Sequence, residues 1–476
     1  MPEPAEPRSS LRLLGPIRPR TWVLGALALV LVLVGLWVFV VQPLVPRQGP
    51  FGFTRSMWAN VHHRPHFAPG TGALIIDNEI WAARAFDPRT AELLGWLEGT
   101  PSHPSWTALD PTGRPLVLLQ RFTELHLLDG RTLETLHAFR LTGWIHSGSL
   151  SEDGTRVLAA RGAPGGEDPH TAWLWDTATG EVVHILRGHE DHLVQAAFAP
   201  GGSMLLTSGR DRTVRLWDPE TGGQIHLLDG LEDEPSRSGF SPDGQYVYTY
   251  TPGSNVYVWS AETGELLWRT ETGPLAIPIF SPCGSRVITR AGGFEVTLRN
   301  AGDGEPVRTF EPTRGEFYTG NFFSGDRTLF TPGGSAFLAE KPGAIALCDT
   351  ETGEVLHRFP MTEDHFQTAV FTPDGSGVLL SSPRDGAVLY DLETGEPVRR
   401  FLPEEEIPPR PGGERQRIVL IAAAFSPEGE RLAISGPDAI LRLFDVESGE
   451  VLRTHPLRPG LWDLFRYTFI KPEWDF

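Results

Sequence analysis

Histidine and cysteine, the side chains most often used to bind metals, occur in this chain without the spacing that a metal site requires. His62, His63 and His66 lie close together, but neighbouring residues of an extended chain point to opposite faces, and no carboxylate or cysteine at ligand spacing completes the set. The two cysteines, Cys283 and Cys348, are 65 residues apart and form no CxxC pair. We therefore expect no metal site, and two unpaired thiols that are buried or half-buried.

The carboxylates are numerous, but many of them recur at one position of a repeat. Nine times along the chain an apolar run ends in an aspartate or in another small polar residue, at Asp87, Asp129, Asp176, Asp218, Ser260, Asn300, Asp349, Asp391 and Asp445. Such residues belong to turns, so we expect them to be structural. The sequence also lacks a Gly-rich phosphate loop, a G-x-S-x-G elbow, an HExxH motif and an EF-hand loop. These features predict a protein that is not an enzyme, with no catalytic residues and no cofactor.

The spacing of these end positions indicates the elements that carry them. Successive positions are 40 to 54 residues apart, and most separations are close to 42. Each repeat contains four apolar runs separated by turns, such as Ser-Pro-Asp-Gly at 241–244 and Thr-Gly-Glu at 263–265. Four strand signals in a period near 42 are typical of a β-propeller. We therefore predict an all-β fold in which residues 65–455 form a single large β-propeller of eight or nine four-stranded blades.

One repeat, Gly188–Gly222, carries the pattern most completely. With its Gly-His pair at 188–189 and its Trp-Asp ending at 217–218, it resembles the repeats of the WD-repeat family, and the resemblance extends over about residues 65–455. It implies a hydrogen-bonded set of four side chains in this blade, His189, Ser208, Asp211 and Trp217. It also implies a non-catalytic scaffold for protein–protein interactions.

An uncharged apolar segment, Trp22–Val41, precedes the repeats. As a helix its 20 residues would span about 30 Å, the thickness of the hydrocarbon core of a bilayer. The segment is longer than the apolar region of a signal peptide and is not followed by a small-x-small cleavage site, so we expect it to be retained. Four arginines precede it, whereas only Arg47 and Arg55 follow closely.

We therefore predict a single-pass inner (plasma) membrane protein whose amino terminus is cytoplasmic. Residues 1–21 are expected to form a disordered basic segment, residues 22–41 the membrane helix and residues 42–64 a tether. The propeller would lie in the periplasm or otherwise outside the cytoplasm.

The net charge bears on the class of partner. The formal net charge is −19, and residues 1–47 carry +3, so the rest of the chain carries −22. A surface of this sign repels the phosphate backbone, and we expect no nucleic-acid partner. Of the 41 basic residues, 39 are arginine, which is typical of a GC-rich bacterial source.

Two insertions, Gly162–His170 and Leu402–Arg417, lengthen the repeats, and the expected strand order places both on one face. Long loops on a rigid scaffold often bind ligands, although each loop taken alone could equally be a solvated spacer. The second insertion has an acidic half and a mainly basic half. We predict that it binds a protein partner of unknown identity through Glu404, Glu405, Glu406, Arg410, Arg415 and Arg417.

The tail at 456–476 is rich in aromatic residues. Exposed aromatic residues at this density favour aggregation, so we expect the tail to pack on the propeller, with a partner-binding surface as the alternative.

A competing resemblance concerns Val258–Trp268, which is similar to the repeats of quinoprotein-like propellers. That resemblance implies either a non-enzymatic envelope assembly scaffold or a pyrroloquinoline quinone-dependent enzyme. The cofactor site of such enzymes typically has adjacent disulfide-bonded cysteines, and this chain has no adjacent cysteines. The Ser-Pro-Asp-Gly turns and the set around His189 favour the WD-repeat interpretation.

Overall fold

The computed structural model describes most of the part of the chain that carries the repeats. The chain divides into two compact units, Met1–Val61 and His62–Phe476. All described residues belong to the second unit, and they are 63–67, 74–78, 83–86, 93–97, 106–120, 123–130, 132, 134–141, 143, 145–161, 170–253, 255–272, 278–290, 296–310, 330–341, 344–360, 368–382, 386–401, 422–435 and 440–456. The predicted membrane segment Trp22–Val41 lies outside these residues. No helix within the described ranges has the length and apolar character needed to cross a bilayer.

The described residues form nine antiparallel sheets, eight with four strands and one with three, each built from strands that are consecutive in the sequence. The first three sheets contain β1 (His63–Phe67), β2 (Leu74–Asn78), β3 (Ala83–Phe86) and β4 (Leu93–Leu97); β5 (Trp106–Leu109), β6 (Pro115–Gln120), β7 (Glu124–Asp129) and β8 (Thr135–Arg140); and β9 (Ile145–Leu150), β10 (Arg156–Arg161), β11 (Ala172–Asp176) and β12 (Val182–Leu186).

The fourth, fifth and sixth sheets follow in the same order, and the fourth includes one 3₁₀ turn, η2 (Pro200–Gly202). Their strands are β13 (Leu193–Phe198), β14 (Leu205–Gly209), β15 (Thr213–Trp217) and β16 (Gln224–Leu228); β17 (Arg237–Phe240), β18 (Tyr246–Tyr250), β19 (Asn255–Ser260) and β20 (Leu266–Glu271); and β21 (Ile279–Phe280), β22 (Arg286–Arg290), β23 (Val296–Asn300) and β24 (Pro306–Phe310).

The last three sheets complete the series. They contain β25 (Ala336–Lys341), β26 (Ala344–Asp349) and β27 (Val355–Pro360); β28 (Thr368–Phe371), β29 (Gly377–Ser382), β30 (Gly386–Asp391) and β31 (Pro397–Phe401); and β32 (Ala422–Phe425), β33 (Arg431–Ser435), β34 (Ile440–Asp445) and β35 (Val451–Pro456).

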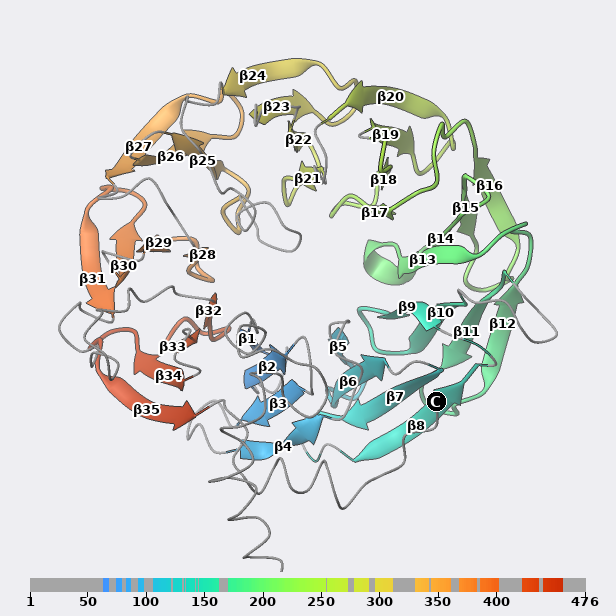
Figure 1. Ribbon diagram of the computed structural model, residues 1–476, viewed down its shortest axis with the longest axis horizontal. Coiled ribbons are helices and arrows are strands. Elements are labelled where there is room, and N and C mark those ends of the chain that lie inside the picture. Colours follow the sequence, from blue (N-terminus) through green and yellow to red (C-terminus); the bar gives the residue numbers. More distant parts are fainter. Residues whose placement is uncertain are drawn as a thin grey trace, which may run out of the picture. The chain divides into compact units, whose positions relative to one another are not determined.

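Consecutive sheets pack against each other within His62–Phe476, and they are the blades of a β-propeller (Figure 1). Buried clusters join neighbouring blades from the second to the ninth; Leu206 and Val214 of the fourth blade, for example, pack with Tyr257 and Trp259 of the fifth. β1 of the first blade contacts β32 and β33 of the ninth, so the first and last blades are adjacent. The predicted all-β propeller is confirmed, and its described part has nine blades.

The seventh blade differs from the prediction of four-stranded blades. Its described sheet contains only β25, β26 and β27. Phe330 pairs with Phe337 of β25 as an isolated bridge, at the place where the first strand of the other blades pairs with the second. Both phenylalanines are buried and their ring centroids are 5.7 Å apart, so this pair fills the inner end of the blade.

The apolar pattern explains why the strands of one blade differ in burial. Every residue of β14, a second strand, is buried, whereas the fourth strand β16 buries fully only its last residue, Leu228. Second and third strands lie between neighbouring blades, so they bury more of their residues than the fourth strands do. The fourth strand pairs on one side only and keeps one edge open.

A β-bulge lies between the third and fourth strands of every blade. In the fourth blade Leu216 pairs with His226, but the next residue, Trp217, pairs with Gln224, so the outer strand holds one extra residue, Ile225. The same shift falls just before the closing Asp, Ser or Asn in all nine blades. Because a bulge twists its strand, the extra residue, here called the bulge residue, is displaced from the regular alternation.

The residue after the bulge joins several blades to the next blade. His184 Nε2 lies 2.8 Å from the main-chain oxygen of Glu220, in a turn of the following blade. His226 bonds in the same way to Glu262, Trp268 to Ala301 and Arg399 to Ser448. The turn glycine is pressed against this side chain: a Cβ on Gly222 would lie 2.8 Å from Cγ of His184, and the φ of Gly222 is +68°. Both the contact and the positive φ therefore favour glycine.

Candidate functional site

A chain of hydrogen bonds runs through the interior of the fourth blade. His189 Nδ1 lies 2.8 Å from Asp211 Oδ2, and His189 Nε2 lies 2.8 Å from Thr207 Oγ1. Trp217 Nε1 donates to the same threonine oxygen at 2.8 Å. Because an indole N–H can only donate and an ionised carboxylate can only accept, Trp217 donates to Thr207 and His189 Nδ1–H donates to Asp211. The structure thus brings together the predicted His189, Asp211 and Trp217.

The hydroxyl predicted for this set was wrong by one residue. Ser208 is buried, but its Oγ has no hydrogen-bond partner among the described residues. Successive residues of a strand point to opposite faces, so Thr207 faces His189 and Ser208 faces away. The gap from Ser208 to Asp211 is one residue shorter than in the repeats that the blade resembles, and this gap is the sequence signal for Thr207.

Asp211 holds two connections at once. Its Oδ2 also accepts the main-chain N–H of Glu190 at 3.0 Å, and its Oδ1 accepts the hydroxyl of Thr213 at 2.8 Å. Burial alone would raise the pKa of Asp211, but hydrogen bonding and electrostatic attraction to His189, together with these donors, hold the pKa well below its usual value. The side chains of His189 and Asp211 are only 2% and 7% exposed, so this pair is closed to a substrate and serves the structure.

The same network fixes the loop that leads into β13. Asp211 anchors this loop through His189 and Glu190, and the buried Leu193 begins the strand. The main-chain oxygen of His192 accepts the N–H of Arg210 at 2.8 Å. Main-chain bonds at Glu190 and at His192 therefore flank Asp191 and hold this part of the loop in place.

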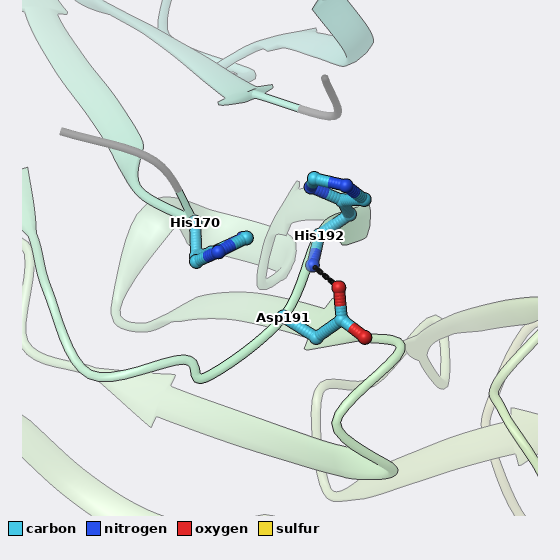
Figure 2. A group of neighbouring side chains, drawn as sticks. All are labelled: His170, Asp191 and His192. Atoms are coloured by element: carbon cyan, nitrogen blue, oxygen red, sulfur yellow. Dashed lines mark hydrogen bonds between the residues drawn. The ribbon is translucent and has the colours of Figure 1, made fainter. Parts of the chain in front are cut away.

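A second group of side chains forms where this loop meets the third blade. His170, which precedes β11, lies beside Asp191 and His192, and one potential ligand atom from each residue lies within 4.8 Å of the others. The two imidazole centroids are 4.9 Å apart. Figure 2 shows the Asp191 carboxylate turned to the main chain of His192, whose N–H donates to Asp191 Oδ1 at 2.7 Å. Two imidazoles and a carboxylate are ligands for divalent first-row metals.

Sequence reasoning missed this group because it combines two blades. Asp191 and His192 stand close to His189, but His170 is 21 residues away from Asp191 and approaches only through the packing of the third and fourth blades. The backbone of His170 has a φ of 65°, a conformation in which histidine is several-fold enriched among residues other than glycine. The expectation of no metal site rested on ligands close together in the sequence.

The surroundings of the group are partly basic. Desolvation lowers the pKa of His146 in β9, and the nearby Arg210 and His192 lower the pKa further. Arg210 Nε lies 3.7 Å from Glu234 Oε2, an exposed pair that partly neutralises the guanidinium.

Comparison with known families finds two matches, each covering less than half of the chain. Residues 180–218, which include Trp217 and the aspartate of the hydrogen-bonded set, match the family described as WD domain, G-beta repeat. Residues 210–369, from the fourth blade to the eighth, match the family described as Outer membrane protein assembly factor BamB. Both resemblances seen in the sequence are thus found, in two ranges that overlap only at residues 210–218.

Matches are also found among solved structures. One is described as "Dihydro-heme d1 dehydrogenase NirN in complex with DHE", and it is 18% identical to this chain with a TM-score of 0.47, covering 71% of this chain and 74% of that chain. No curated protein matches the chain.

The cysteines do not form the pair that the quinone-enzyme interpretation requires. Cys283 is exposed, Cys348 is buried, and neither forms a disulfide. Cys283 occupies the same turn position in the sixth blade as Asp243 does in the fifth. Ser281 Oγ lies 3.4 Å from Cys283 Sγ, and the equivalent Ser241 Oγ lies 2.5 Å from Asp243 Oδ1. Hydrogen bonds from Ser281 and then Ser285 lower the pKa of the Cys283 thiol. The cysteine is therefore a variant of the turn.

The repeated aspartates cap turns, as expected. Asp176 Oδ1 accepts the main-chain N–H of Ala178 at 3.0 Å and of Thr179 at 2.9 Å, and Asp349, Asp391 and Asp445 make equivalent bonds. Their carboxylates are thereby committed to the fold.

Several predicted site residues lie outside the described residues. These are Glu404, Glu405, Glu406, Arg410, Arg415 and Arg417, all of Gly162–His170 except His170, and the tail beyond residue 456. His63 and His66 lie in β1, and His62 lies outside the described residues.

Proposed function

We propose that this protein is a non-catalytic β-propeller scaffold that binds other proteins along its outer strands. The observation that supports this proposal is the chemistry of the bulge residue. It is apolar in all nine blades: Leu94, Leu136, Val183, Ile225, Leu267, Val307, Leu356, Val398 and Leu452.

Five of the nine bulge residues are exposed, and Leu136, Val183 and Val307 are partly buried. Val398 is 56% exposed, Leu356 is 50% exposed, and Ile225, Leu267 and Leu452 are also exposed. Other apolar residues of the same outer strands, Leu266 and Val451 among them, add to this surface. Outer strands commonly protect an open edge with charge, so the exposed apolar side chains at this position in five blades indicate a contact surface.

The open edge suggests how a partner binds. The fourth strand of each blade has a neighbour on one side only, within the described residues. An extended segment can add to such an edge by main-chain hydrogen bonds, while its apolar side chains contact the bulge residues. We propose an apolar, extended partner segment, with Leu402–Arg417 as a second, charge-steered contact.

A second candidate is an assembly scaffold of the cell envelope. The match of residues 210–369 to the family named for outer membrane protein assembly favours it. Under this candidate the extended partner is an outer membrane protein or a component of its assembly. The quinone-dependent enzyme is the weaker alternative, because the two cysteines lie in different blades and form no disulfide.

Site-specific photo-crosslinking tests the outer strands. A photoreactive residue at position 356 or 398 of the full-length protein should capture a partner in intact membranes. The substitutions Leu266→Ser, Leu356→Ser and Val398→Ser together should abolish co-purification of that partner. The matched control is Arg358→Ser with Arg400→Ser, which changes exposed residues of β27 and β31 without removing apolar surface.

A parallel variant tests the insertion. Replacing Leu402–Arg417 by a short Gly-Ser turn should weaken capture and make it less sensitive to salt, because the charged residues are removed. Capture that survives both this replacement and the triple serine variant would contradict the proposed scaffold surface.

We also propose that Trp22–Val41 anchors the protein in the inner membrane, with the propeller outside the cytoplasm. The protein should then resist extraction by carbonate, and alkaline phosphatase fused after Phe476 should be active. A stable but inactive fusion would place the propeller in the cytoplasm. A mature chain that starts near Arg47 would show cleavage of the segment.

A further inference from the structure

We propose that His170, Asp191 and His192 bind a divalent transition-metal ion of the zinc class. The three residues come from two blades, and the ion would tie the segment before β11 to the loop before β13. This site is separate from the outer strands and does not depend on the scaffold proposal.

The first argument is the donor set. Two imidazoles and one carboxylate are typical ligands of Zn²⁺ at sites that keep a further position for water or another ligand. Oxygen-only cations such as Ca²⁺ and Mg²⁺ use carboxylates and carbonyls rather than imidazoles, and Cu(I) favours sulfur. The three side chains therefore fit a divalent ion of intermediate softness.

The second argument is the state of the two imidazoles. The Nδ1 atoms of His170 and His192 are both buried and have no hydrogen-bond partner among the described residues. Two nearby histidines differ in this respect. His189 forms hydrogen bonds through both ring nitrogens, and His184 forms one through Nε2. A buried polar atom without a partner is unfavourable, and a metal ion would use the lone pair of an unprotonated nitrogen.

The third argument is positioning. Asp191 Oδ1 accepts the N–H of His192, which orients the carboxylate, and Asp191 makes no other hydrogen bond within the described part of the chain. His189, two residues earlier, is fixed by Asp211 and Thr207. The loop is thus held before any ion binds, which lowers the entropy that an ion must overcome.

The geometry requires a small closure. Ligand atoms of a tetrahedral zinc site with bonds of about 2.0–2.2 Å are about 3.4 Å apart. The three potential ligand atoms here lie within 4.8 Å of one another, so they must approach by up to about 1.4 Å. Rotation of the side chains about Cα–Cβ and Cβ–Cγ supplies such a movement without a change in the main chain.

The test is a titration of the full-length, detergent-solubilised protein from which metals have been removed with a chelator. Zn²⁺ followed by calorimetry should bind at one site that is lost or weakened at least about tenfold by His170→Ala and by His192→Ala. Co²⁺ should give a visible absorption band typical of low coordination, with the same dependence on these residues. The matched control His226→Gln removes an imidazole from the next blade junction and should leave the affinity unchanged.

Asp191→Asn keeps the proposal testable if a histidine variant folds poorly. The asparagine oxygen can still accept the N–H of His192, but it lacks the charge, so the affinity for Zn²⁺ should fall. Zn²⁺ should also raise the thermal midpoint of the parent protein and not that of His192→Ala. Absence of binding by the parent protein, or equal affinity and stoichiometry in all three variants, would overturn the proposal.

Discussion

The indole nitrogen of Trp217 and the hydroxyl oxygen of Thr207 lie 2.8 Å apart, on neighbouring strands of the fourth blade. Through this contact the outer part of the blade is joined to the loop of His189, because the same oxygen bonds His189 Nε2. Both Thr207 and Trp217 are buried. The apolar core of the blade therefore contains a continuous series of hydrogen bonds from Trp217 through Thr207 and His189 to Asp211.

Trp217→Ala should destabilise the protein by about 3–5 kcal/mol, because it removes a buried indole and leaves a cavity. Chemical unfolding of the full-length protein in detergent would measure the loss. Trp217→Phe should cost less, since it keeps most of the packing and loses only the hydrogen bond to Thr207. A loss below about 1 kcal/mol for the alanine variant would be incompatible with a buried side chain.

Thr207 and Ser208 should respond differently to loss of the hydroxyl. Thr207→Val keeps the shape but leaves Trp217 Nε1 and His189 Nε2 without a partner, so it should cost about 1–3 kcal/mol or more. Ser208→Ala removes a buried hydroxyl that has no partner among the described residues, and it should be neutral or slightly stabilising. A larger loss of stability for Ser208→Ala than for Thr207→Val would instead support the original prediction that Ser208 belongs to the hydrogen-bonded set.

The fold was readable from the sequence because each blade repeats the same local signals. Turns with proline and glycine, and an aspartate after the third strand, mark the blade boundaries without any knowledge of contacts between blades. The seventh blade could not be predicted as well. The apolar pattern of its repeat indicates a complete first strand, but the described structure has only the single bridge of Phe330 with Phe337 at that place.

The pH dependence of stability should show the contribution of Asp211. Its pKa in the folded protein is lowered, so its stabilisation is fully present above the unfolded value of about 3.9 and is lost as the pH falls through the folded value. Asp211→Asn should therefore destabilise the protein at pH 7 by about 1–3 kcal/mol. The difference from the parent protein should shrink below about pH 4, as measured by urea unfolding; a constant difference would contradict this assignment.

The candidate metal group was not readable from the sequence for a physical reason. Metal-ligand motifs are recognised when the ligands share one turn or strand, as Asp191 and His192 do, whereas His170 belongs to a different blade. The bulge residues are a different case. An apolar residue three positions after the turn glycine, as Ile225 is after Gly222, is visible in the sequence, but its exposure depends on the bulge.

The contact between His184 and Gly222 gives a test of how blades are joined. Gly222→Ala introduces a Cβ that would lie 2.8 Å from Cγ of His184, at a φ of +68°. Gly113→Ala is the matched control, because its φ is +78° and nothing lies within 4 Å of the added Cβ. The control should cost about 1–2 kcal/mol, the penalty of the left-handed conformation alone, and Gly222→Ala should cost more.

A double-mutant cycle separates the two causes. In a His184→Ala background the contacts with the imidazole are gone and only Cβ of residue 184, 3.1 Å from the added Cβ, remains, so Gly222→Ala should cost less than in the parent background and closer to the cost of Gly113→Ala. His184→Ala alone should cost about 1 kcal/mol, because it removes the 2.8 Å hydrogen bond to the oxygen of Glu220. Equal costs of Gly222→Ala in both backgrounds, measured by unfolding, would show that His184 does not press on the turn and that the junction of the third and fourth blades depends on other contacts.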